Sequence, residues 1–354
     1  MGRKSKEQTN HKEWFCANCP LCFFTSCTTI KLWFIWKILQ GGDCVNKAQL
    51  VFKAVDIIGN PLQNNFHFEN VLSVRDIAYG SEKLNKGDLY YIPEILNDGK
   101  KHPIIVYYHG GAFLAGDKKY RVSICEYYAK EGYFVFCPNY RMPPEVDYKG
   151  LMRDCVDSLN FVQALAEKYN IDLENVVLTG DSAGGYIASY LAAIKYNEML
   201  CDVIGCNKVN VDLKGLMLMC GIYDLEVLMK GTSLMGVIPT TARTLLNFNF
   251  KNDFSNIKDF PDYEYISPAS FVNDKWCSTF ICWADDDLVC QGQGEPMAEK
   301  LKAVVPLYDQ YHVAGIQNNH CFHLTPSINK YARECLQKSL DFLVALFAEE
   351  KVTV

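Results

Sequence analysis

A serine flanked by glycines is the first feature of this chain with an evident capacity for chemistry. Ser182 stands in the run Gly180-Asp181-Ser182-Ala183-Gly184-Gly185, directly after the apolar stretch 176–178. A G-x-S-x-G pattern between a strand and a helix is typical of a sharp turn that exposes a serine hydroxyl. The glycines are needed there because side chains would collide with the neighbouring strand and helix. We therefore predict that Ser182 is a nucleophile.

A pair of glycines offers a second part of the same chemistry. Gly110 and Gly111 follow the apolar stretch 103–109 in the run His109-Gly110-Gly111-Ala112-Phe113. Hydrolysis of an ester passes through a tetrahedral oxyanion, which backbone N–H groups reach only where no side chain blocks their approach. We predict that the N–H groups of Gly110, Gly111 and Ala183 form an oxyanion hole.

A serine hydroxyl also needs a base, and a neutral imidazole is the usual one near physiological pH. Among the seven histidines, His320 follows the last predicted strand and precedes the C-terminal helix. In the chain order serine, acid, histidine, this is the place for the base, with His323 as a bystander.

The orienting carboxylate should follow the predicted strand 279–283. Three consecutive residues, Asp285, Asp286 and Asp287, compete for that role.

The elements that must position these residues follow from residue types and breakers. Strands are predicted over 50–58, 71–80, 88–92, 103–109, 133–138, 176–178, 216–220, 279–283 and 307–313, with helices over 148–169 and after Ser182. From residue 133 onward strands alternate with helices, which predicts an α/β fold with a mostly parallel sheet covered on both faces. The alternation lapses over about 224–265, where we predict a lid.

The N-terminal part of the chain differs from the rest. Residues 14–39 are apolar and aromatic but contain Pro20, Lys31 and Lys37, so they do not make a clean membrane span. Leu32, Ile35, Trp36 and Leu39 share one helical face. We predict a segment 1–47 that forms a cap helix or lies on a membrane surface, followed by a hydrolase domain 48–354. Four cysteines at 16, 19, 22 and 27 lack the separated pairs of a zinc site and are better candidates for lipidation.

Composition limits the classes of partner. The chain has 354 residues and a net charge of -6, and its basic run is confined to the first dozen residues, which disfavours nucleic acid as a partner. A small-molecule substrate is the expectation. Sixteen cysteines are scattered through the predicted elements rather than spaced as a disulfide framework. This favours buried thiols and a reducing, cytoplasmic compartment.

Taken together, several motifs resemble those of the hormone-sensitive-lipase-like carboxylesterases of the α/β-hydrolase superfamily. They are His109–Phe113, Asn139–Glu145, Gly180–Gly185, Ser267-Pro268 and His320–Phe322. The resemblance runs from about Leu89 to the C-terminus. It implies a mainly parallel eight-stranded sheet with helices on both faces and a helical cap, and hydrolysis of carboxylic esters with no metal or organic cofactor. The family pattern places the acid two residues before a leucine, which selects Asp286.

The chain departs from that pattern at a few positions. Ala112 replaces the third glycine of the oxyanion loop, Met142 opens an altered Met-Pro-Pro-Glu segment, and Cys321 replaces a glycine after the histidine. These changes concern the shape of the acyl pocket, so the sequence does not predict which ester is preferred.

The function predicted from the sequence is that of a serine carboxylesterase. Ser182 attacks the ester, His320 moves the proton and Asp286 orients the imidazole. Two alternatives are a ligand-binding protein on the same scaffold, as in the plant gibberellin receptors, and an amidase or peptidase of the same fold. Receptors of that kind have lost the histidine. The oligomeric state is not predicted.

Overall fold

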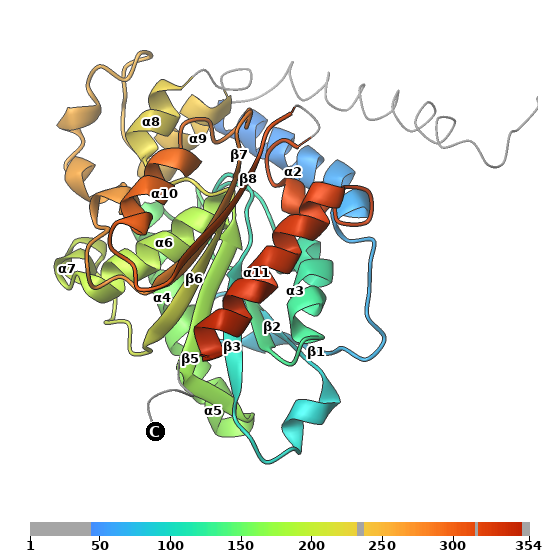
Figure 1. The fold of residues 1–354 in the computed structure, drawn as a ribbon. Coiled ribbons are helices and arrows are strands. Elements are labelled where there is room, and N and C mark those ends of the chain that lie inside the picture. The colour runs from blue at the N-terminus through green and yellow to red at the C-terminus, as the bar shows by residue number, and fades with distance from the viewer. Residues whose placement is uncertain (1–43, 232–236, 316–317, 349–354) are drawn as a thin grey trace, which may run out of the picture. The chain divides into compact units, whose positions relative to one another are not determined.

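Eight strands form one sheet, and the predicted site motifs lie at its carboxyl edge (Figure 1). Its strands are β1 (Leu72–Ala78), β2 (Lys86–Tyr91), β3 (His102–Tyr108), β4 (Phe134–Pro138), β5 (Ile171–Asp181), β6 (Leu213–Met219), β7 (Ser278–Ala284) and β8 (Tyr308–Val313). They are ordered β1-β2-β4-β3-β5-β6-β7-β8. β2 pairs antiparallel with β1 and β4, and every other pair is parallel. The predicted eight-stranded, mainly parallel sheet is confirmed.

This computed structural model describes residues 44–231, 237–315 and 318–348. These residues belong to one compact unit that begins at Cys44, and the predicted division of the chain at residue 47 stays a prediction. The predicted cap or membrane-surface segment 14–39 lies outside the described residues, as do the four cysteines at 16–27.

Helices cover both faces of the sheet, as a parallel sheet requires. Those of the described residues are α2 (Cys44–Gln63), α3 (Val122–Ala129), α4 (Tyr148–Asn160), α5 (Val162–Lys168), α6 (Ala183–Tyr196), α7 (Met199–Ile204), α8 (Leu225–Lys230), α9 (Val237–Leu246), α10 (Gly294–Lys302) and α11 (Lys330–Ala348). α3 and α11 pack on one face, and α4, α6 and α10 pack on the other (Figure 1). Alternate residues of β3 enter the two cores, with Ile104 and Val106 on one side and Ile105 and Tyr107 on the other.

One predicted strand is wrong. Residues 50–58 lie inside helix α2, although they are rich in β-branched side chains. Leu50, Ala54, Ile57 and Ile58 recur at i, i+4, i+7 and i+8, which is the spacing of one helical face. Here helical periodicity outweighed the residue preference for strands, which is weak and depends on context.

The insertion predicted as a lid, about 224–265, contains α8, α9 and two short 3-10 turns, over Ile257–Asp259 and Tyr263–Tyr265. Four aromatic rings pack against one another within it: Phe248, Phe250, Phe254 and Phe260. Its α9 contacts α2. Whether this insertion acts as a lid stays a prediction.

The turn from β5 into α6 forces two backbones into close contact. Ser182 precedes α6 with φ 56° and ψ -119°, a strained conformation for a residue with a side chain. Its N–H donates to the carbonyl oxygen of Met219 at 3.0 Å, which ties the turn to β6. A Cβ atom on Gly184 would collide with the carbonyl oxygen of Tyr108 at the end of β3. Only a glycine therefore lets the first turn of α6 lie this close to β3.

We expect Gly184→Ala to lower the free energy of unfolding by about 1–3 kcal/mol or more, because backbone atoms cannot yield to the added methyl group. The matched control is Gly59→Ala in α2, where an added Cβ would lie 3.5 Å from Nε2 of Gln63 and meet no backbone. Removing a helical glycine should leave stability unchanged or slightly higher. Urea unfolding monitored by circular dichroism measures both, and equal effects would contradict the close approach.

Candidate active site

Three side chains from three different loops form one chain of hydrogen bonds at the carboxyl edge of the sheet. Ser182, after β5, places its Oγ 2.8 Å from Nε2 of His320. Nδ1 of His320 lies 2.8 Å from Oδ2 of Asp287, which follows β7. In this arrangement the serine hydroxyl donates to the imidazole, and the other ring N–H donates to the carboxylate. The structure thus brings Ser182 and His320 together as predicted.

The predicted acid, Asp286, is wrong. Its Oδ2 accepts a hydrogen bond from the N–H of Gly315 at 2.8 Å, and it does not contact His320. Asp285 pairs instead with Nδ1 of His312 at 3.0 Å. Asp287 takes the position beside His320 because the chain turns back after β7, with the N–H of Asp287 donating to the carbonyl oxygen of Ala284.

Burial separates Asp287 from its two acidic neighbours. Asp287 is 4% exposed, whereas Asp285 and Asp286 are exposed to solvent. Its Oδ1 accepts hydrogen bonds from the N–H groups of Val289 and Cys290, each at 2.7 Å. The carboxylate is therefore fixed on one side by the backbone and on the other by the imidazole. The leucine spacing used in the sequence analysis pointed one residue too early.

The charges of this pair depend on each other. Burial alone would lower the pKa of His320, but the Asp287 carboxylate and the Cys290 thiol outweigh it and raise that pKa well above its usual value. For Asp287 burial alone would raise the pKa, but His320 and the two backbone N–H groups hold it below the ordinary value. Asp287 is thus an anion at neutral pH, suited to stabilise an imidazolium.

The three residues predicted for the oxyanion hole surround Ser182. Ala183 is the first residue of α6, and Gly111 lines the same cavity as Ser182. A Cβ atom on Gly110 would lie 3.0 Å from Cβ of Ser182 and 2.7 Å from the carbonyl oxygen of Asp181, so the backbone of Gly110 lies directly against the nucleophile turn.

His109 supports the glycine loop from within the core. Its ring stacks on that of Tyr140, with ring centroids 4.5 Å apart, and the Tyr140 hydroxyl donates to the carbonyl oxygen of His109 at 2.6 Å. The Nδ1 atom of His109 lies 2.8 Å from the carbonyl oxygen of Gly110. His109 thus supports the glycine loop through the backbone of Gly110 and the ring of Tyr140.

A cavity of about 230 Å³ opens above Ser182 and His320. Its wall includes Val51, Phe52 and Val55 from α2, together with Ala112 and Val289. Among the described residues, none of the wall comes from the insertion 224–265. The contribution of α2 to this wall was not predicted from the sequence, because residues 50–58 were expected to form a strand.

One carboxylate in that wall is unusual. Burial raises the pKa of Asp56 to about 6, although Arg121 partly opposes the shift. Its Oδ2 is buried and has no hydrogen-bond partner in the described part of the chain. No sequence pattern indicated this residue.

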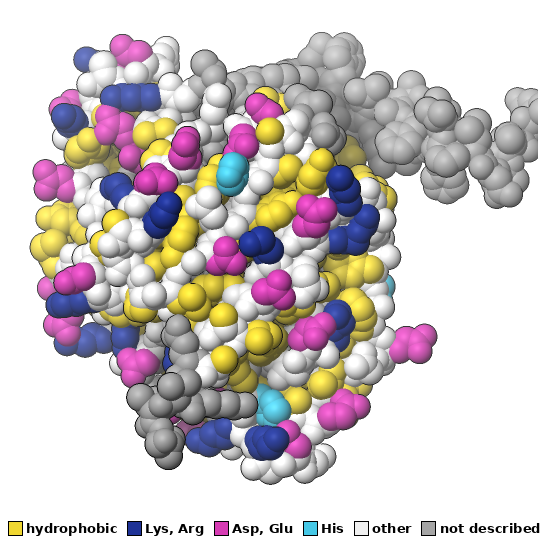
Figure 2. Space-filling model, viewed as in Figure 1, with side chains coloured by type: hydrophobic (Ala, Val, Ile, Leu, Met, Phe, Trp, Pro, Cys, Tyr) yellow, Lys and Arg dark blue, Asp and Glu magenta, His cyan; other side chains and the backbone are white. Residues whose placement is uncertain are grey.

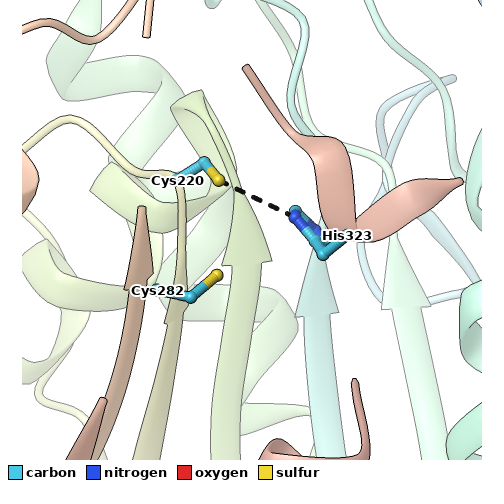
Figure 3. Close-up of side chains that lie close together, drawn as sticks. All are labelled: Cys220, Cys282 and His323. Carbon is cyan, nitrogen blue, oxygen red and sulfur yellow. Dashed lines mark hydrogen bonds between the residues drawn. The ribbon is translucent and has the colours of Figure 1, made fainter. Parts of the chain in front are cut away.

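Two groups of side chains near the site combine thiol, imidazole or carboxylate atoms. Cys220, Cys282 and His323 are buried side by side, with Sγ of Cys220 3.8 Å from Nδ1 of His323 (Figure 3). The second group is Asp287, Cys290 and His320 of the hydrogen-bond chain itself. Histidines that bind metals usually donate their other ring N–H, whereas Nε2 of His323 is buried and finds no partner among the described residues. The first group therefore fits a packed thiol cluster better than a metal site.

Behind the nucleophile lies a buried ion pair. Arg121, just before α3, donates from Nε to Oδ1 of Asp181 at 2.6 Å and from Nη2 to Oδ2 at 2.7 Å. The Tyr107 hydroxyl donates to the same carboxylate at 3.1 Å. Burial alone would raise the pKa of Asp181, but Arg121 outweighs it and lowers the pKa to about 2. The pair connects the start of α3 to the residue that precedes the nucleophile.

We expect Arg121→Met to cost about 3–5 kcal/mol of unfolding free energy at pH 7, because it leaves a buried carboxylate without its cation. A depressed pKa contributes stability that is present above about pH 4 and is lost as the pH falls toward 2, so the difference from wild type should shrink in acid. The control is Arg153→Met, an exposed residue of α4 that donates to the carbonyl oxygen of Ile204. Denaturant unfolding at several pH values tests this, and a pH-independent loss would contradict it.

Comparison with known proteins identifies the family. The sequence profile of the BD-FAE family matches residues 88–301. A probable isoprenylcysteine alpha-carbonyl methylesterase of rice is 30% identical over 125 residues, 35% of this chain and 29% of that protein. Esterase LipI of Mycobacterium tuberculosis is 30% identical over 122 residues, 34% of this chain and 38% of that protein. The matches thus span only about a third of these relatives.

Solved structures share the fold over nearly the whole described unit. Esterase B of Lactobacillus rhamnosis superposes with a TM-score of 0.73 at 22% identity and covers 87% of this chain and 96% of its own. An esterase of the hyperthermophilic archaeon Pyrobaculum calidifontis superposes with a TM-score of 0.63 at 20% identity, covering 91% and 98%. The fold predicted from the motifs is therefore confirmed, and because the family profile spans more than half of the sequence, the chain belongs to the BD-FAE family of α/β-hydrolases.

Proposed function

We propose that this chain is a serine hydrolase of carboxylic esters. The observation that carries the proposal is the continuous set of hydrogen bonds from Ser182 through His320 to Asp287, each 2.8 Å long. The esterases among the relatives and structural neighbours support the same chemistry. A binding protein on this scaffold would have no use for a base held between a hydroxyl and a buried carboxylate.

The geometry suits a two-step reaction through an acyl-enzyme. His320 accepts the proton of Ser182 as Oγ attacks the ester carbonyl, then returns that proton to the leaving alcohol. Asp287 accepts the Nδ1–H and stabilises the imidazolium. The N–H groups of Gly110, Gly111 and Ala183 bind the oxyanion, each worth ~10²–10³ in rate in known cases. Water activated by the same histidine then releases the acid.

The cavity suggests the class of ester. A volume of about 230 Å³ and apolar side chains such as Val51, Phe52 and Val289 favour compact, uncharged acyl groups.

Among the described residues, no helix is long and apolar enough to cross a membrane. We propose a membrane-surface role for residues 14–39 on their sequence alone, and a cytoplasmic location on the abundance of free cysteines.

The test of the proposal is Ser182→Ala. We expect hydrolysis of p-nitrophenyl acetate to fall by ~10³ or more and fluorophosphonate labelling to disappear, because the nucleophile is gone while the oxyanion donors remain. The matched control is Ser189→Ala, a buried serine of α6 whose hydroxyl donates to the carbonyl oxygen of Gly185. Labelling that persists in Ser182→Ala would place the nucleophile elsewhere.

Asp287→Asn tests the assignment of the acid. It should lower kcat on the order of 10⁴-fold, while Asp286→Asn and Asp285→Asn should cost little, because neither contacts His320. His320 must be neutral to act as the base. Because its pKa is raised above the usual 6.5, kcat/KM of wild type should rise with pH at a pH above 6.5. Loss of the Asp287 charge should move that rise to lower pH. A large loss in Asp286→Asn, with a mild one in Asp287→Asn, would reverse the assignment.

A further inference from the structure

Helix α2 is amphipathic, but it turns its polar side toward the protein. Nε2 of Gln49 donates to the carbonyl oxygen of Leu114 at 3.2 Å. Oε1 of Gln63 accepts from Arg121 at 3.5 Å, and the backbone of Gly116 lies close enough to Asp56 to oppose the rise of its pKa. Gln49, Asp56 and Gln63 thus hold α2 against the glycine loop and the start of α3, although Lys53 of the same helix is exposed. An ordinary surface helix turns most of its polar residues to water instead.

The apolar side of α2 faces outward. Its exposed side chains are Leu50 (37%), Val55 (55%), Ile57 (60%), Ile58 (42%) and Leu62 (43%), which we call the outer face of α2. They account for five of the eleven large apolar residues that are exposed in the described part of the chain. By contrast, apolar side chains are scattered among charged ones on the side that α11 crosses (Figure 2). A contiguous exposed apolar face of this kind marks an interaction surface.

We propose that the outer face of α2 docks on a lipid surface. In the part of the chain that the structure describes, the five side chains of the outer face are each 37–60% exposed, and an amphipathic helix with an exposed apolar face meets the main requirement for lying in the interface of a bilayer. The chain directly before α2 adds a second signal, because residues 14–39 are apolar and aromatic and residues 3, 4, 6 and 12 are basic. Basic residues beside an apolar segment favour anionic lipids.

The position of the helix also favours a lipid occupant over a second copy of the chain. Val51, Phe52 and Val55 of α2 line the cavity above Ser182, and Val55 belongs to the outer face as well. Apolar surface therefore continues from the docking face to the wall of the active-site cavity. A stable dimer usually buries about 800 Å² on each partner, which five side chains of one helix do not supply. If the chain is an esterase as proposed, apolar esters would reach the cavity from the membrane.

The experiment is flotation of the full chain with vesicles, either of phosphatidylcholine alone or of phosphatidylcholine with phosphatidylserine. The variant is the triple change Leu50→Gln, Ile58→Gln and Leu62→Gln, which spares the cavity. The control is Ile328→Gln with Val344→Gln, which are 67% and 65% exposed on other surfaces. We expect the triple variant to lose at least ~10-fold in vesicle partition, because three apolar side chains no longer leave water. The control should bind as wild type does, and both should hydrolyse soluble p-nitrophenyl acetate normally.

A second measurement covers the case in which the triple variant does not fold. Ile58→Trp keeps the face apolar. The emission that it adds, measured as the difference from wild type with its five native tryptophans, should be quenched by vesicles of brominated phosphatidylcholine with phosphatidylserine. The emission that Val344→Trp adds on α11, measured in the same way, should not be quenched. Neither readout depends on catalysis, so failure of the docking proposal and failure of the esterase proposal are distinguishable.

Three results would overturn the proposal. In the first, the folded triple variant floats as well as wild type, so residues 14–39 alone would hold the chain to lipid. In the second, wild type does not float and the added tryptophan of the Ile58→Trp variant is unquenched. In the third, sedimentation velocity shows that wild type is a dimer and the triple variant a monomer, so that the outer face of α2 would bind a second copy of the chain.

Discussion

The contact between the first turn of α6 and the end of β3 is the constraint on which this site depends. Gly184 leaves no room between its backbone and the carbonyl oxygen of Tyr108, and the strained φ of Ser182 is held by that contact and by the bond to Met219. Strain of this kind persists only where surrounding structure fixes it. Here the fixed parts are three adjacent strands, β3, β5 and β6. The same packing brings Gly110 against the turn that holds Ser182. One steric requirement therefore aligns the proposed nucleophile with the proposed oxyanion-hole glycines.

Two buried aspartates near Ser182 are kept charged by different means. Asp181 is compensated by a guanidinium in a bidentate pair, and Asp287 by two backbone N–H groups and an imidazole. An arginine keeps its charge at any working pH, so the Asp181 pair is suited to structure. An imidazole gains and loses a proton near neutrality, so the Asp287 pair is suited to catalysis. Similar side chains thereby take different roles according to the partner that the fold supplies.

Helix α2 connects the candidate site to the surface of the molecule. Its polar side chains fix the glycine loop from outside, while Val51 and Phe52 close the cavity over Ser182. Leu50, Val55, Ile57, Ile58 and Leu62 of the outer face are left exposed. A helix that packed in the usual orientation would bury those apolar groups but would lose its bonds to the loop. The observed orientation gives the site its wall and at the same time leaves a face for a partner.

Much of this protein could be predicted from its sequence, because local signals specify it. Strand and helix alternation predicted the sheet, and the glycine patterns around Ser182 and Gly110 reflect steric needs of the backbone that only certain residues meet. His320 followed from its place after the last strand. The helical state of α2 was carried by the spacing of its apolar residues, although their β-branched types pointed to a strand. Two features could not be predicted: the choice of Asp287 among three equal carboxylates, and the orientation of α2. Both features depend on contacts with residues distant in the sequence. Asp287 is selected by its contact with His320, and α2 is oriented by its contacts with the loop Leu114–Gly116 and with Arg121. Only the folded chain brings these segments together.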